Sequence, residues 1–146
     1  MGLGDLFVIR TAGEVVDKSI LATLEYGAEH LHIPLLVVMG HESCDVVSVA
    51  AQAKGEATSA NTAYLLKAIQ AARRQPRQQP EEIKGLILAN VEQVVNDALA
   101  GSALLRRMVD TGQLGVVGAY YELVSGRVMF SEMVRSESPA PGSERH

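Results

Sequence analysis

The sequence predicts an α/β fold in which helices flank a mostly parallel sheet. Short β-prone apolar runs alternate with longer segments whose apolar residues recur at helical spacing, a pattern typical of parallel sheets with helices on both faces. The last two β-prone runs, 114–121 and 127–130, are separated by a Ser-Gly turn. That turn indicates an antiparallel hairpin at the edge of the sheet.

Composition is that of a soluble globular domain. The chain has 146 residues, of which 47% are apolar and 21% charged, and this length is enough to bury a core. A net charge of −4 argues against a nucleic-acid partner, and no apolar stretch is long enough to span a membrane. The single cysteine excludes an internal disulfide, and a reduced thiol suits the cytoplasm.

The N-terminal part of the chain predicts a strand, a helix and a second strand. Residues 6–10 form a short β-prone run. A helix follows, for which Asp17 or Ser19 supplies the N-terminal cap. The apolar run 35–39 predicts a buried strand, and Gly40 allows a sharp exit from it.

The middle of the chain is mainly helical by pattern. Segments 46–51 and 60–74 favour helices, and a polar loop with two prolines follows them. Pro80 suits the first turn of a long helix whose apolar face runs over residues 83–98. Ser102 then caps a short helix.

The motif His41-Glu42-Ser43-Cys44, directly after the run 35–39, carries the chemistry. An imidazole and a thiol three positions apart at a strand end can bind one metal ion, and zinc accepts both. Ligands of such sheets bind at the carboxyl ends of the strands. However, Cys44 is the only cysteine, and two side chains do not complete a zinc site.

Each candidate residue has an alternative interpretation. Without metal, Cys44 would be a small buried apolar residue and His41 would hydrogen-bond to the backbone. Asp45 could cap a helix or turn its carboxylate toward a metal. His30 and His32 flank a helix end, where a histidine favours the helix dipole.

The order of several strings resembles β-class carbonic anhydrases. Residues 4–13 resemble the strand and Arg-Asn-Ala-Gly turn of that family, with Thr11 where Asn is usual. The string Gly-His-Glu-Ser-Cys over 40–44 resembles the zinc motif Gly-His-x-x-Cys, followed here by Asp45 where Gly is usual. Further similar segments are 19–31, 90–93 and 117–126.

The resemblance implies zinc as the cofactor and carbon dioxide and bicarbonate as the substrates. In this family two cysteines and one histidine hold zinc, and a water on the metal loses a proton and attacks carbon dioxide. A carboxylate paired with an arginine near the metal orients the nucleophile. On this resemblance His41 and Cys44 are two of the three protein ligands.

The sequence departs from the family at its first zinc motif, Cys-x-Asp-x-Arg, which does not occur here. We therefore expect an N-terminally truncated domain over residues 1–135, missing the inner first strand, and a disordered tail over 136–146. In the family that strand lies between those matching 6–10 and 35–39. These two strands must then pair directly or leave a gap that a partner fills.

Two functions remain open. One is the zinc-dependent reversible hydration of carbon dioxide, at family level, with an incomplete zinc site in this chain. The other is that of a catalytically inactive relative that acts through self-association or partner binding. Since a missing inner strand would expose aliphatic faces, we expect a homo-oligomer, at least a dimer.

Overall fold

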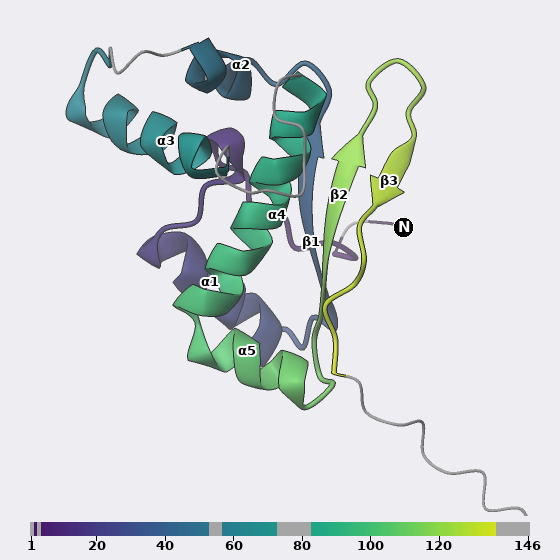
Figure 1. Cartoon of the computed structure of the whole chain (residues 1–146). Coiled ribbons are helices and arrows are strands. Elements are labelled where there is room, and N and C mark those ends of the chain that lie inside the picture. Colours follow the sequence, from purple (N-terminus) through teal and green to yellow (C-terminus); the bar gives the residue numbers. More distant parts are fainter. Residues whose placement is uncertain (1, 3, 53–56, 73–82, 137–146) are drawn as a thin grey trace, which may run out of the picture.

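The computed structural model describes residues 2, 4–52, 57–72 and 83–136 (Figure 1). The α/β fold predicted from the sequence is confirmed. In chain order the elements are η1 (Ala12–Glu14), α1 (Lys18–His30), β1 (Leu35–His41), α2 (Asp45–Gln52), α3 (Ala60–Ala71), α4 (Ile83–Gly101), α5 (Ala103–Asp110), β2 (Gly115–Tyr121) and β3 (Val128–Phe130).

The sheet has three strands in the order β1-β2-β3. Strands β1 and β2 are parallel, in a register that begins at Leu35 opposite Gly115 and ends at His41 opposite Tyr121. Strand β3 pairs antiparallel with β2, which confirms the predicted hairpin. In the part of the chain that the structure describes, the other edge of β1 pairs with no strand.

The predicted strand over residues 6–10 is wrong. This segment has no regular secondary structure, and Leu6 and Val8 are 65% and 66% exposed. Phe7 lies on α1 instead, where a side chain at Gly27 would come within 2.9 Å of its ring. Because β-propensity reflects packing and pairing rather than the backbone alone, a β-prone run without a partner edge stays irregular. Of the two arrangements expected from the sequence, direct pairing of residues 6–10 with β1 does not occur.

The predicted helices are confirmed where the structure describes them. The carboxylate of Asp17 accepts from the backbone N–H groups of Ser19 and Ile20, both at 2.9 Å, and so caps α1. The Ser102 hydroxyl accepts from Leu105 N at 3.1 Å and caps α5. The expected start of the long helix at Pro80 and the tail from residue 137 lie outside the described residues.

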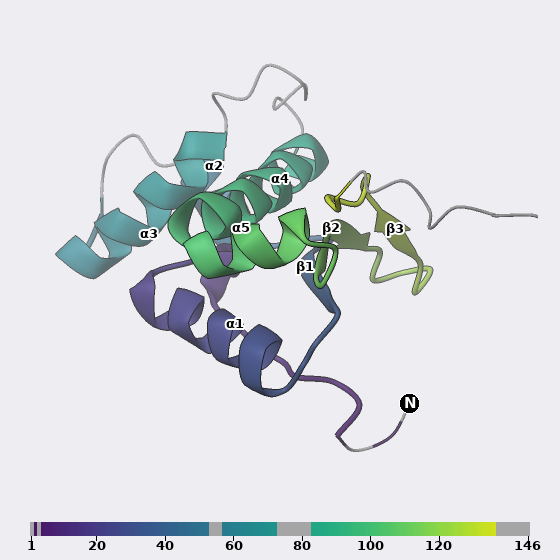
Figure 2. The same ribbon diagram turned by 90° about the horizontal axis from the view of Figure 1, so that it is seen from below.

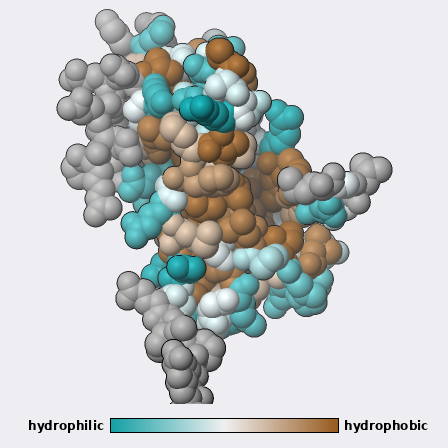
Figure 3. Space-filling view, turned by 90° about the vertical axis from the view of Figure 1, so that its right-hand side faces the viewer, coloured by the Kyte–Doolittle hydropathy of each residue, from teal (hydrophilic) through white to brown (hydrophobic). Residues whose placement is uncertain are grey.

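The helices gather on one side of the sheet, although the sequence predicted helices on both faces (Figures 1 and 2). Helix α4 packs along β1 and β2, and Val38 and Val116 share an apolar core with Val91. Helices α2 to α5 all belong to the connection between β1 and β2, and one right-handed crossover places its helices on a single face. Figure 3 shows a broad hydrophobic area on the side of the molecule at the right of Figure 1.

Candidate metal centre

His41 is the last residue of β1 and is exposed at the carboxyl end of the sheet. The parallel ladder continues one residue further, because Glu42 N donates to Tyr121 O at 2.8 Å. The ring of His41 turns back on this loop, with Nδ1 2.8 Å from the Glu42 carbonyl oxygen. Since a carbonyl only accepts, Nδ1 carries the proton, and Nε2 keeps a lone pair for a metal ion.

Cys44 lies where the loop enters α2 and is only 4% exposed. Its carbonyl accepts from Ser48 N at 3.0 Å, the first hydrogen bond of the helix. Between the two candidate ligands the chain turns sharply at Ser43, whose φ is +56°. Asp45, proposed as a possible third donor, is the first residue of α2 and is exposed.

The side chains of Glu14 and Asn90, which were not predicted from the sequence, lie together beside β1. Glu14, in η1, is half-buried, and a protonated His41 would lower the pKa of its carboxyl. The buried amide of Asn90, on α4, donates to Gly13 O at 2.8 Å and to Glu14 Oε2 at 3.1 Å. Burial raises the pKa of Glu14, against the lowering effect of that hydrogen bond. The one sequence signal was a polar Asn within the apolar face of the long helix.

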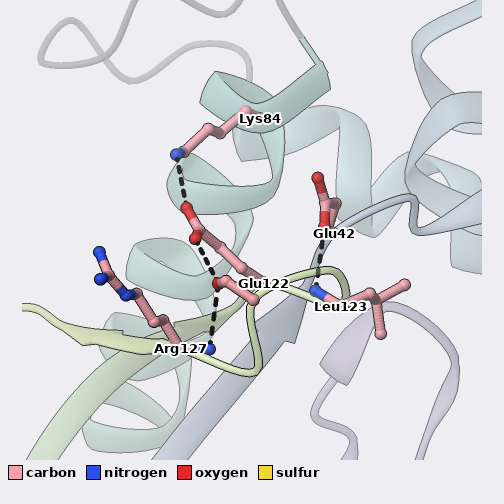
Figure 4. A network of polar contacts seen from close by, with 6 residues as sticks. Glu42, Lys84, Glu122, Leu123 and Arg127 are labelled. Carbon is pink, nitrogen blue, oxygen red and sulfur yellow. Dashed lines mark hydrogen bonds and ion pairs between the residues drawn. The ribbon is translucent and has the colours of Figure 1, made fainter.

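A second polar group lies around the turn between β2 and β3 (Figure 4). Lys84 Nζ is 5.0 Å from the ring centre of Tyr120 and 3.5 Å from Glu122 Oε1. Burial raises the pKa of the Tyr120 phenol, and the charge of Glu42 raises it further. These side chains line a shallow pocket that also borders Ser43.

The donors present fit zinc in kind but not in number. An imidazole nitrogen and a thiol are both ordinary zinc ligands, whereas a catalytic zinc needs three protein ligands. Among the described residues no three His, Cys, Asp or Glu side chains are placed to hold one metal ion. Asp45 therefore does not complete the pair formed by His41 and Cys44.

Comparison with known proteins decides the family. Residues 1–128 match the family described as carbonic anhydrase. A curated relative, carbonic anhydrase 2 of Mycobacterium tuberculosis, is 31% identical over 139 residues, which cover 91% of this chain and 66% of the relative. Among solved structures, the β-carbonic anhydrase of Coccomyxa superposes with a TM-score of 0.80 at 24% identity, over 93% of this chain and 65% of that one.

This chain belongs to the β-class carbonic anhydrase family. The carbonic anhydrase of Mycolicibacterium smegmatis is 32% identical over 133 residues, which cover 87% of this chain and 63% of the relative. A tetrameric β-carbonic anhydrase of Sordaria macrospora has a TM-score of 0.76 at 22% identity, over 89% of this chain and 70% of that one. The chain thus spans about two thirds of the length of the curated carbonic anhydrases it matches.

The region that matches the carbonic anhydrase family, residues 1–128, includes β1 and the loop that follows it, and therefore both the imidazole of His41 and the thiol of Cys44. None of the helices described for this carbonic anhydrase relative is long and apolar enough to cross a bilayer.

Proposed function

We propose that this chain is a carbonic anhydrase domain that supplies two of the three protein ligands of a zinc ion. The family reaction is the reversible hydration of carbon dioxide to bicarbonate, and the ligands in this chain are His41 and Cys44. The third ligand comes from outside the described residues. The observation that carries the proposal is the His41 ring, whose Nδ1 is engaged by the Glu42 carbonyl so that Nε2 is available.

The chain's own part in the reaction is to hold and orient. When bound, zinc lowers the pKa of water so that hydroxide forms near neutral pH. His41 and Cys44 hold the ion at the carboxyl end of β1, and the Glu42 carbonyl fixes which ring nitrogen faces it. Asn90 holds the η1 turn and the Glu14 carboxylate beside this edge.

The open edge of β1 is where we place the missing donors. A free strand edge accepts a further strand through its backbone groups. On the face of β1 turned away from α4, Leu35 and Met39 are 42% and 43% exposed. A strand beside β1 that bears a Cys-x-Asp-x-Arg pattern would bring a second thiolate toward the same sheet end. An identical copy cannot do so, because Cys44 is its only cysteine.

Without such a strand the second candidate function holds, that of a non-catalytic relative. The absence of a third donor among the described residues favours it for the chain alone. The apolar side of the sheet then serves self-association, and we propose a homo-oligomer of at least two copies. The single free thiol suits the cytoplasm, where we place the protein.

Stopped-flow hydration of carbon dioxide tests the proposed division of ligands. With zinc supplied, we expect the chain alone to give no more rate than its His41→Ala variant. Joining a strand with the Cys-x-Asp-x-Arg pattern ahead of residue 4 should create a zinc-dependent rate that His41→Ala and Cys44→Ser each abolish. If the extended chain folds and is active, but neither His41→Ala nor Cys44→Ser lowers its rate, the ligand assignment is overturned.

A further inference from the structure

Glu42 makes three polar contacts, two of which join the candidate metal loop to the β2–β3 hairpin. Its N–H donates to Tyr121 O at 2.8 Å, and its carbonyl accepts from His41 Nδ1 at 2.8 Å. Its carboxylate accepts from the backbone N–H of Leu123 at 2.9 Å (Figure 4). The residue between the two proposed ligands is therefore held on the hairpin by both its backbone and its side chain.

The hairpin turn is largely exposed. The Leu123 side chain is 53% exposed, and the 3.5 Å ion pair between Lys84 and Glu122 joins two partly exposed side chains. Such an exposed pair contributes little stability. The second connection is the hydrogen bond from the backbone N–H of Leu123 to the Glu42 carboxylate, and a bond to a carboxylate is stronger than one between neutral groups.

We propose that Glu42 is a positioning residue for His41, an inference that rests on the proposed role of His41 as a ligand. With its N–H and its carboxylate both held, the Cα of Glu42 is fixed and its carbonyl points in one direction. That carbonyl then keeps the proton of the His41 ring on Nδ1 and leaves Nε2 to the metal. The hairpin turn thereby sets the orientation of a metal ligand it does not touch.

The tautomer of His41 tests this inference without metal. Long-range proton–nitrogen NMR spectra distinguish Nδ1–H from Nε2–H rings, and a His41→Asn variant identifies the signal among the four histidines. The spectra are recorded at about pH 8, above the ordinary histidine pKa of about 6.5. In the wild type we expect the Nδ1–H tautomer. Glu42→Ala should give a mixture of both tautomers.

Two further variants separate the hydrogen bond from charge and from folding. Glu42→Gln keeps an oxygen acceptor for Leu123 N–H and should retain the Nδ1–H tautomer. Glu42→Asp keeps the charge, but its side chain is one methylene too short to reach the Leu123 N–H. This variant should give the mixture of both His41 tautomers. As a matched control, Ser125→Ala removes two contacts within the same turn, to Glu122 and to Arg127 N, without touching Glu42, and should behave as wild type.

Titration with Co²⁺ alone, followed by its sulfur charge-transfer absorption, gives the second measurement. Loss of an outer hydrogen-bond partner typically weakens metal affinity by about 10–100-fold, so Glu42→Ala and Glu42→Asp should bind Co²⁺ at least about tenfold more weakly. An unchanged tautomer in both variants would overturn the role of Glu42. A sulfur-to-Co²⁺ absorption that is absent from the wild type, or that survives His41→Asn unchanged, would instead overturn the proposed ligand pair.

Discussion

At the scale of single residues, Asn90 connects the core to the candidate site. Its amide is only 1% exposed and serves two acceptors, the Gly13 carbonyl and the Glu14 carboxylate. These partners lie more than seventy residues away in sequence. Local spacing revealed His41 and Cys44, but no local pattern could reveal a pair that only the packing of η1 on α4 brings together.

Replacing Asn90 with Leu should destabilise the fold. Leu has nearly the same volume, so the change removes the donor without opening a cavity, and it leaves two acceptors without their partner. A buried group that loses its partner costs about 1–3 kcal/mol, which urea unfolding followed by circular dichroism measures. The same change at the exposed Asn61 of α3 is the control. An Asn90 variant as stable as the Asn61 variant would contradict this role.

The Glu14 carboxyl should make stability depend on pH. Because burial raises its pKa, the folded chain holds this proton more tightly than the unfolded chain. The stability Glu14 contributes is complete at low pH and is lost as the pH rises through the folded pKa. Glu14→Gln keeps an acceptor for Asn90, so its free energy of unfolding should rise relative to wild type between about pH 4 and 7.

The control for this pH trend is Glu122→Gln. The hydroxyl of Ser125 lowers the pKa of Glu122, so here the wild type holds an advantage at neutral pH that is lost as the pH falls through the folded pKa. Urea titrations at several pH values measure the free energy of unfolding of each variant relative to wild type. Plotted against pH, this difference should have slopes of opposite sign for Glu14→Gln and Glu122→Gln. Slopes of equal sign would contradict the assigned cause of the Glu14 shift.

At the scale of elements, the close approach of β1 and α4 positions the site. A side chain at Gly40 would lie 2.7 Å from Val91 and 2.9 Å from Ile87, so only glycine lets the helix pack this near to the end of the strand. The sequence predicted the strand and the long helix because each has a clear apolar period. It could not predict that residues 6–10 lack a partner, since pairing is not encoded in the run itself.

Gly40→Ala should therefore strain the contact between β1 and α4. Overpacking of this kind costs about 1–3 kcal/mol, which thermal or urea unfolding measures. Shortening the facing side chain with Val91→Ala should recover part of that loss in the double variant. If the two losses of stability simply add in the double variant, the methyl group introduced at position 40 does not contact Val91.

At the scale of the whole molecule, we expect the side of the sheet without helices to mediate association. The alternation of strands and helices predicted the α/β class, but one crossover covers only one face. The other face keeps exposed apolar residues on strand β3 and beyond it, among them Val128, Phe130 and Met133. A surface of this extent favours a partner.

Sedimentation velocity at micromolar concentration should show a dimer or a larger oligomer. Substitutions of like charge on the open side, Met39→Glu with Phe130→Glu, should shift the chain toward monomer, because burying an unpaired charge opposes association. Val124→Lys, at a 94% exposed position of the hairpin tip, is the control and should leave association unchanged. A monodisperse wild-type monomer would contradict the predicted interface.

We propose that His41 and Cys44 are zinc ligands whose third protein partner lies outside the described residues. The most direct test of this ligand pair is the zinc content of the purified chain by elemental analysis, after dialysis against metal-free buffer. We expect far less than stoichiometric zinc in the chain alone. Stoichiometric zinc that survives dialysis of the chain alone, and is lost in both His41→Ala and Cys44→Ser, would contradict it.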